Sequence, residues 1–252
     1  AHEYRRYDSV WDLCCDHGYL GLRVLHEALC DQVVFVDRVP HIMADLAARL
    51  EACASPATAS AAAAPGNHVQ APAASSSPDV GDARIPAPSH RLLTCDAASL
   101  RPPRGLRHLL VIAGLGGEQI AALVEALHEG NGGHPGDYLL CPANNPHELR
   151  TLLRSLDLRL ESEAIVTEKG RQYEVIHVSR PGTAENAGTP AMPTTPMQPA
   201  TPVTPVGVMW NPDDPNHRQH RDRLLRHYRN RSRGETDGRS LAIAALYAAC
   251  MK

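Results

Sequence analysis

The chain has 252 residues, of which 43% are hydrophobic and 4% aromatic, and its formal net charge is −3 at pH 7. This length accommodates one α/β domain with an appendage, and the charge excludes a protein that is basic over its whole surface. No apolar run reaches the roughly 18 residues of a membrane span, and no signal peptide opens the sequence. Seven cysteines without the spacing of a disulfide framework predict free thiols and a cytoplasmic protein.

Apolar runs that predict strands alternate along the chain with segments whose apolar spacing predicts helices. The expected strands are 9–15, 32–37, 90–96, 107–114 and 137–142, and the expected helices are 19–30, 41–52, 118–129 and 145–156. Strands that are apolar on both faces and separated by amphipathic helices predict an α/β fold, with a parallel sheet covered on both sides. Residues 158–180 form two β-rich runs, so we expect a terminal antiparallel hairpin. A Rossmann-like sheet that ends in such a hairpin is typical of class I methyltransferases.

Two stretches of low complexity divide the chain. Residues 54–89 consist mostly of Ala, Pro and Ser, and residues 181–207 are rich in Pro and Thr. Neither stretch can bury enough apolar surface to offset the entropy of ordering it, so we interpret the first as a disordered insertion and the second as a linker. The expected organisation is a methyltransferase-like domain at 1–180, which contains the insertion, and a small helical appendage at 208–252.

The ends of the first two predicted strands carry polar groups. In open α/β sheets, ligands bind at the carboxyl ends of the strands. Asp16, His17 and Gly18 follow the first strand, where a glycine allows the backbone to approach a ligand and the next helix offers free N–H groups. Asp37 ends the second strand and is placed to accept both hydroxyl hydrogens of a ribose. A helix N-cap or a solvated loop acid is the alternative role for Asp37.

The next two strand ends extend this pattern. Asp96 is placed to accept a hydrogen bond from an adenine amino group, although it could equally be a loop acid. Gly114, Gly116 and Gly117 follow a buried strand and favour close approach of a ligand, while a tight start to the next helix is the alternative. The joint occurrence of two acids and two glycine-bearing turns at successive strand ends favours an adenosine-type cofactor.

Several segments together resemble the bacterial tRNA (adenine-22-N1)-methyltransferases. They are Asp-Leu-Cys-Cys-Asp-His-Gly-Tyr-Leu at 12–20, Ile-Ala-Gly-Leu-Gly-Gly at 112–117, and the stretch from Tyr138 through the final hairpin. The resemblance covers about residues 8–53 and 90–180. Cys14 and Cys15 stand in place of a small Gly-Ser pair, Gly21 stands where proline is common, and 141–144 replaces a Gln-Pro-Asn segment.

The resemblance implies an S-adenosyl-L-methionine site at the strand ends. Asp16, His17 and Gly18 would line the methionine end of the cofactor, with Cys15 beside them. Asp37 and its neighbour Arg38 would lie at the ribose, and Asp96 and Ala97 would face the adenine. The floor between methyl donor and target base would consist of Ala113, Gly114, Leu115 and Gly116.

The Cys-Cys-Asp-His cluster at 14–17 also suggests zinc or a nucleophilic thiol. Adjacent cysteines at a strand end point to opposite faces of the sheet, and no second Cys or His pair lies near them in the sequence to complete a set of four ligands. A thiol nucleophile needs a paired histidine and a path for the leaving group, and His17 is the only nearby candidate. We therefore expect neither a metal site nor a catalytic thiol here.

Methyl transfer from a sulfonium to adenine N1 needs alignment more than it needs a strong base. Asp16 and Asn144 are the candidates to take or stabilise the proton that the exocyclic nitrogen sheds afterwards. A paired or stacked base would first have to be exposed.

The C-terminal segment 216–252 predicts two helices, the first of which carries a dense series of arginines. Arg218, Arg221, Arg226 and Arg229 are the expected phosphate contacts to tRNA. A solvated basic helix docked on the main domain is the alternative. At the level of the whole protein, two other hypotheses stay open: a methyltransferase of the same fold that acts on a protein or small molecule, and a non-catalytic RNA-binding module.

Overall fold

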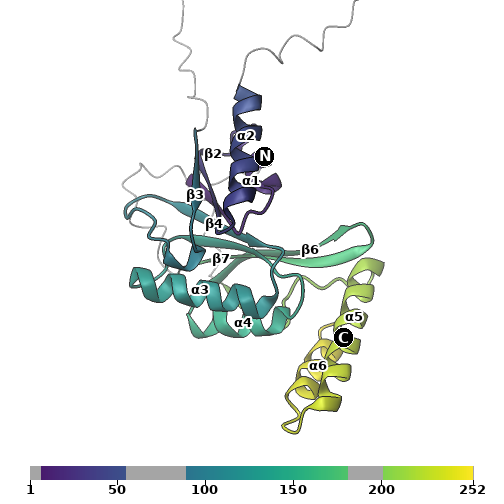
Figure 1. Ribbon diagram of the computed structural model, residues 1–252. Coiled ribbons are helices and arrows are strands. Elements are labelled where there is room, and N and C mark those ends of the chain that lie inside the picture. The colour runs from purple at the N-terminus through teal and green to yellow at the C-terminus, as the bar shows by residue number, and fades with distance from the viewer. Residues whose placement is uncertain (1–6, 55–88, 181–200, 252) are drawn as a thin grey trace, which may run out of the picture.

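The computed structural model describes residues 7–54, 89–180 and 201–251 (Figure 1). Residues 55–88 of the predicted insertion and 181–200 of the predicted linker lie outside the described residues. The interpretation of these two segments as a disordered insertion and a linker therefore stays a prediction.

The strands of the described residues form one mixed sheet in the order β3-β2-β1-β4-β5-β7-β6-β8. Strands β1 to β5 pair in parallel, whereas β7 lies antiparallel between β5 and β6. The strands are β1 (Tyr7–Leu13), β2 (Cys30–Asp37), β3 (Ser89–Thr94), β4 (His108–Ala113), β5 (Asp137–Cys141), β6 (Arg159–Glu168), β7 (Arg171–Ser179) and β8 (Thr201–Pro202). The predicted α/β fold with a parallel sheet and a terminal antiparallel hairpin is confirmed.

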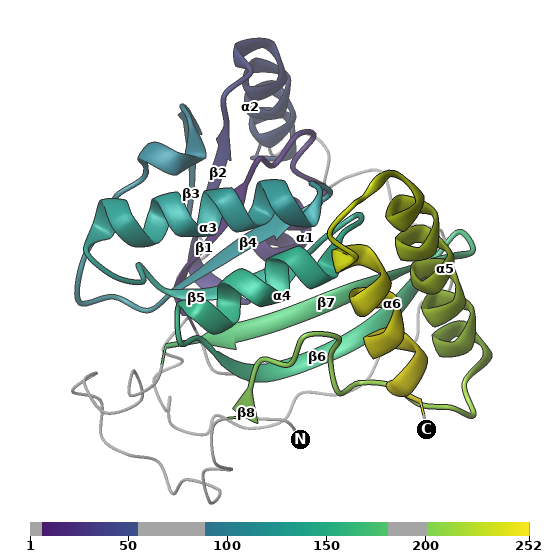
Figure 2. The same ribbon diagram turned by 90° about the horizontal axis from the view of Figure 1, so that it is seen from below.

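Helices cover both faces of this sheet. Helices α3 (Gly117–Asn131) and α4 (Pro146–Ser155) lie side by side across one face (Figure 2). Helices α1 (Tyr19–His26) and α2 (Pro40–Ala54) pack against the other face. Side chains alternate along each strand, so in β2 Val34 and Val36 join the core under α3 and α4, while Val33 and Phe35 join the core under α1 and α2.

Element boundaries around the first turn differ from the expected ones. The strand expected at 9–15 ends at Leu13, because Cys14 has a positive φ of 56° that takes the chain out of the extended conformation. The helix expected at 19–30 ends at His26, and Ala28, with a φ of 50°, reverses the chain into β2. Cys30, which was expected to end the helix, is instead the first residue of β2, and its side chain is buried.

The C-terminal part forms two helices, as predicted, namely α5 (Pro215–Arg231) and α6 (Arg239–Ala249). A separate small core, which includes Leu224, Tyr228, Ile243 and Tyr247, holds them together. They protrude from one end of the sheet, with α5 next to β7 (Figure 1).

Residues 201–207 differ from the prediction of a linker. Thr201 and Pro202 pair with β6 as β8, and Val203 is buried in the main core. This short stretch escaped prediction because its Pro-Thr composition matches that of the preceding segment, while its partner strand lies about 40 residues earlier in the chain.

Within the described residues, no helix combines the length and the apolar character that crossing a bilayer requires.

Candidate active site

The turn after β1 is built from residues with left-handed backbone conformations. Cys14, Asp16 and Gly18 have φ values of 56°, 47° and 68°. For a non-glycine residue this conformation costs on the order of 1–2 kcal/mol, so the turn stores strain at the position where a ligand was predicted. The turn exposes Asp16 and His17, while Gly18 is buried, and a Cβ on Gly18 would lie only 2.8 Å from a methyl carbon of Leu46.

Asp37 joins this turn to the end of β2. Its Oδ2 accepts a hydrogen bond from the backbone N–H of Asp16 at 3.2 Å, and its Oδ1 accepts one from Val39 at 2.9 Å. The structure thus brings Asp16 and Asp37 together, as the sequence predicted. The contact with Val39, just before α2, shows that Asp37 also has the local structural role weighed as its alternative. A carboxylate has about four acceptor positions, so capacity remains for a ligand.

Asp96 lies at the end of β3 and is exposed. Its Oδ1 accepts a hydrogen bond from the N–H of Ala98 at 2.9 Å and caps the short 3₁₀ helix η2 (Ala97–Ser99). The loop-acid role is therefore real, and Oδ2 has no hydrogen-bond partner among the described residues. Ala97 is buried, whereas Arg38, which follows Asp37, is exposed.

The glycine-rich turn after β4 contains both an open space and tight packing. Gly114 has a φ of 82°, and a Cβ placed on it would meet nothing within 4 Å. By contrast, a Cβ on Gly117 would lie 2.1 Å from the backbone oxygen of Asn145. Gly114 therefore leaves room for a ligand, whereas Gly117 permits the tight start of α3 that was the alternative role of this turn.

Asn144 lies against this turn. A Cβ on Gly116 would be 2.9 Å from its Oδ1, and the backbone oxygen of Asn144 accepts a hydrogen bond from Gly117 at 2.9 Å. A further bond, from Ala143 N–H to the Leu115 oxygen at 2.8 Å, fixes the segment after β5 against the turn. The structure thus brings the predicted catalytic candidate Asn144 next to the predicted floor, Ala113 to Gly116.

The two adjacent cysteines belong to different faces of the sheet. Cys14 packs against the core under α3 and α4, and Cys15 packs against the core under α1 and α2. Burial, with the nearby carboxylates of Asp37 and Asp96, raises the pKa of Cys14, and burial with Asp12 raises the pKa of Cys15 to about 12. Both thiols stay protonated at neutral pH, and this disfavours the thiolate that a zinc ligand or a nucleophile requires.

Asp12 is a buried carboxyl group that begins the motif at 12–20 but was given no role from the sequence. Its Oδ2 accepts a hydrogen bond from the backbone N–H of Gly21 at 2.9 Å, and burial raises its pKa to about 7. A Cβ on Gly21 would meet this same oxygen at 2.9 Å and the Phe35 ring at 2.4 Å. Asp12 therefore fixes the start of α1 beneath the turn, and Gly21 is required for that close packing.

The raised pKa of Asp12 predicts a specific pH dependence of stability. The contribution of Asp12 is fully present below the unfolded pKa, near 3.8, and is lost as the pH rises through about 7. Asp12→Asn keeps an acceptor for Gly21 but cannot ionise. Between pH 5 and 6.5, urea unfolding should show the parent losing up to about 2 kcal/mol relative to Asp12→Asn. A difference that does not change with pH would contradict the assignment.

A buried ionic network connects the C-terminal helices to the sheet. The guanidinium of Arg150 on α4 is fully buried and contacts Glu163 on β6 at 2.7 Å and Glu174 on β7 at 2.8 Å. Glu174 also accepts a hydrogen bond from His220 on α5 at 3.3 Å. Burial alone would raise the pKa of Glu174, but the charge of Arg150 and the hydrogen bond from His220 outweigh it and hold that pKa below its usual value.

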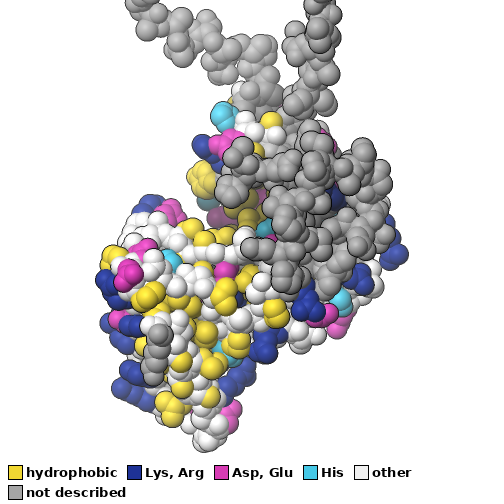
Figure 3. Space-filling view, turned by 180° about the vertical axis from the view of Figure 1, so that it is seen from behind, with side chains coloured by type: hydrophobic (Ala, Val, Ile, Leu, Met, Phe, Trp, Pro, Cys, Tyr) yellow, Lys and Arg dark blue, Asp and Glu magenta, His cyan; other side chains and the backbone are white. Residues whose placement is uncertain are grey.

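The predicted RNA-binding arginines lie on α5. Arg218, Arg226 and Arg229 are exposed, whereas Arg221 forms an ion pair with Asp222 at 2.9 Å. Figure 3 shows Lys and Arg side chains gathered along one edge of the protruding C-terminal helices, beside a face rich in hydrophobic side chains. Exposure fits both phosphate contact and a solvated basic helix, so the RNA-binding role of these arginines stays a prediction.

The side chains at the carboxyl edge of the sheet fit an adenosine-type cofactor. Asp37 is oriented by two backbone N–H groups and can still accept hydrogen bonds from a ribose. At the end of β4 the position beside Gly114 is open, since a Cβ there would meet nothing within 4 Å. S-adenosylmethionine requires this combination of a ribose acceptor and free space beside the target.

Comparisons with known proteins agree with this architecture. A family model described as a methyltransferase domain matches residues 87–176. No protein of curated function matches the sequence. TrmK of M. capricolum, solved with S-adenosyl-homocysteine, is 10% identical to this chain, with a TM-score of 0.59. The match covers 97% of this chain and 89% of that one. The B. subtilis m1A22 tRNA methyltransferase TrmK is 16% identical, with a TM-score of 0.57, and the match covers 96% of this chain and 88% of that one.

A third similar structure is Sp1610 of Streptococcus pneumoniae in complex with S-adenosyl-L-methionine. It is 14% identical with a TM-score of 0.59, and the match covers 98% of this chain and 92% of that one. The fold is therefore that of a class I methyltransferase. More narrowly, the chain shares, over nearly its whole length, the fold of the tRNA (adenine-22-N1)-methyltransferases that its sequence resembles, and that expectation is confirmed at the level of the fold.

Proposed function

We propose that this protein is an S-adenosylmethionine-dependent RNA methyltransferase that methylates N1 of an adenine in tRNA. The observation that carries the proposal is the carboxyl edge of the sheet, where Asp37 bonds the turn after β1 and Asn144 lies against the glycine-rich turn after β4. The likeness of fold to proteins described as m1A22 tRNA methyltransferases supports the choice of substrate.

Each group at this edge has a defined task in the proposed reaction. S-adenosylmethionine supplies a methyl group on a positively charged sulfur. Asp37 binds the ribose, Asp16 and His17 lie at the methionine end, and Asp96 with Ala97 lies at the adenine. The turn from Ala113 to Gly116 admits the target base. Since displacement at a methyl group depends on alignment, the main work of these side chains is to hold the two reactants in line.

Asn144 and Asp16 are the proposed groups for handling the proton. Adenine N1 carries a lone pair and attacks without a strong base. The exocyclic nitrogen then sheds a proton, which the Asp16 carboxylate accepts directly or through water. The amide oxygen of Asn144, next to Gly116, accepts a hydrogen bond from the exocyclic amine and orients the base. The base must leave its stack to reach this position.

The exposed arginines of α5 supply the proposed contacts to RNA phosphates. Replacing Arg226 and Arg229 with glutamine should weaken tRNA binding and flatten its salt dependence by up to about 0.9 log unit for each phosphate contact removed, and less on single strands. Filter binding over a range of salt concentrations measures this slope. Arg104→Gln is the control. Arg104 is exposed and precedes the amino end of β4, so this variant also removes one arginine charge but should leave the salt slope unchanged. Equal slopes for all variants would favour the solvated-helix alternative.

Calorimetry and methyl transfer separate this proposal from its rivals. Micromolar binding of S-adenosylmethionine supports an enzyme, whereas no heat at millimolar ligand would support a non-catalytic RNA-binding module. Transfer of tritiated methyl groups to bulk tRNA supports the RNA substrate. Binding of the cofactor without transfer to any RNA would favour a protein or small-molecule substrate instead.

A further inference from the structure

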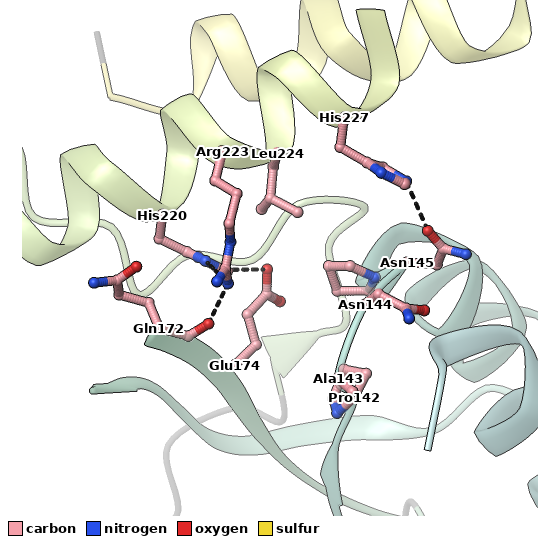
Figure 4. A pocket seen from close by; sticks show the side chains of 11 residues that line it. Pro142, Ala143, Asn144, Asn145, Gln172, Glu174, His220, Arg223, Leu224 and His227 are labelled. Carbon is pink, nitrogen blue, oxygen red and sulfur yellow. Dashed lines mark hydrogen bonds and ion pairs between the residues drawn. The ribbon is translucent and has the colours of Figure 1, made fainter. Parts of the chain in front are cut away.

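A pocket lies between α5, β7 and residues 142–146, directly beside the candidate active site. Its volume is about 170 Å³, less than the roughly 300–1,000 Å³ of pockets for drug-sized ligands. A pocket of this size suits one part of a polymer, such as a phosphate with its sugar. Figure 4 shows His220 and Arg223 pointing from α5 toward Gln172 and Glu174, while His227 reaches Asn145.

Arg223 is a cation without a carboxylate partner among the described residues. Its Nη2 donates to the backbone oxygen of Gln172 and to Nδ1 of His220 at 3.0 Å, which leaves Nε and Nη1 as donors. Arg150 and Arg231, its neighbours at the same interface, each contact at least two carboxylates, but within the described part of the chain Arg223 forms no ion pair. Burial lowers the pKa of Arg223, so an anion in the pocket would stabilise its charge.

The carboxylate in the pocket is already paired on both of its oxygens. Glu174 contacts Arg150 through Oε2 and His220 through Oε1. Because Nδ1 of His220 accepts from Arg223, its Nε2 carries the proton and donates to Glu174. Arg150 thus offsets part of the negative charge of Glu174, because the same guanidinium also contacts Glu163.

The amino terminus of α4 adds a second attraction for an anion. Asn145 is the N-cap residue with a φ of 48°, and no side chain caps the helix. Helix amino termini carry partial positive charge, and this end of α4 borders the pocket at Pro146, which itself has no N–H. At the same rim, Nε2 of His227 donates to Oδ1 of Asn145 at 2.8 Å and so holds the N-cap residue in place.

Asn144 connects this pocket with the site of methyl transfer. It lines the pocket, and its Oδ1 also lies close to Gly116 of the glycine-rich turn. A nucleotide whose base lies at Asn144 therefore has its backbone within reach of α5.

We infer that this pocket binds a backbone phosphate of the substrate RNA, next to the target nucleotide, with Arg223 as its principal ligand. The inference rests on the proposed function, and it adds a contact that positions the nucleotide next to the target base. The planar guanidinium of Arg223 can contact two phosphate oxygens in a fixed geometry, which a lysine cannot do.

The test compares tRNA binding by the full chain and its Arg223→Gln, Arg223→Lys and Arg104→Gln variants over a range of salt concentrations. Arg223→Gln should weaken binding about tenfold and lower the salt slope by about 0.7–0.9 log unit. Arg223→Lys should keep the slope and recover only part of the affinity, because it keeps the charge and loses the geometry. Arg104→Gln should match the parent.

Further readouts separate phosphate binding from helix docking. S-adenosylmethionine affinity and melting temperature should equal those of the parent, and the KM for tRNA should rise while kcat holds. If Arg223→Gln lowers the melting temperature, the phosphate pocket is tested with His227→Ala instead. His227 is exposed, so its removal should leave the melting temperature unchanged, while tRNA binding should weaken several-fold.

Each outcome bears on a different claim. If the parent methylates tRNA and its salt slope survives both Arg223→Gln and His227→Ala, the phosphate pocket is wrong and the proposed function stands. If the parent binds tRNA in an Arg223-dependent way without methylating it, the pocket stands and the proposed function fails. No binding of tRNA by the parent overturns both.

Discussion

Replacing Arg150 with methionine is expected to lower the free energy of unfolding by about 3–5 kcal/mol, because two buried carboxylates lose their common cation. Arg150 is fully buried, and the side chains of Glu163 and Glu174 are 3% and 1% exposed. Methionine has a similar length and fills most of the space, so the loss is electrostatic rather than a cavity effect. Urea unfolding at pH 7 measures the change.

Two controls isolate the network. Arg154→Met, on the exposed side of the same helix, should change stability by less than about 0.5 kcal/mol. Adding Glu174→Gln to Arg150→Met should recover part of the loss, because it removes one of the unpaired charges. In the single variant the unpaired carboxylates favour protonation, so the deficit should shrink from pH 7 to pH 4.5. A deficit that is independent of pH and of Glu174 would mean that packing is responsible.

Replacing Asp37 with alanine is expected to weaken S-adenosylmethionine binding about 30- to 150-fold. A charge-assisted, partly buried contact to two ribose hydroxyls contributes about 2–3 kcal/mol, at roughly 1.4 kcal/mol for each factor of ten. Isothermal titration calorimetry measures the affinity.

The matched control for Asp37→Ala is Asp45→Ala, which removes an exposed carboxylate from α2 and should leave binding unchanged. Asp37→Asn keeps an acceptor for the Val39 N–H but loses the charge, so it should bind nearly as weakly as the alanine variant while melting like the parent. If Asp37→Ala binds as tightly as the parent, the ribose lies at another strand end.

The strands of the parallel sheet could be predicted because each one has a clear local pattern. Val33 to Val36 are all buried, and a short run that is apolar on both faces, bounded by polar residues, is typical of a strand inside a parallel sheet. The place of β7 between β5 and β6 could not be predicted, since a hairpin pattern fixes the pairing of its own strands and not the edge on which they add. The pairing of β8 with β6 is a similar contact between distant segments.

The parts of the candidate site that could be predicted are residues whose type and position in the sequence alone indicate a role, namely acids and glycines at the ends of buried strands. Asp37 and the Gly114–Gly117 turn follow buried strands, and their position at the sheet edge follows from topology alone. Arg150 and Arg223 were not distinguishable from the other arginines, because their burial depends on partners on other elements. Arg150 meets Glu163 and Glu174, which lie 13 and 24 residues away in the chain. The role of Asp12 could not be predicted, because the sequence does not show that its carboxyl group accepts a hydrogen bond from the backbone N–H of Gly21.

The central claim is methylation of an adenine in tRNA, and one measurement tests it most directly. The full chain is incubated with bulk tRNA and tritiated S-adenosylmethionine, the tRNA is digested, and the nucleosides are separated, with Asp37→Ala as the matched inactive control. We expect label in N1-methyladenosine with the parent and little or none with the variant at limiting cofactor. Label confined to another nucleoside, or no label in RNA while the parent still binds S-adenosylmethionine, would contradict the claim.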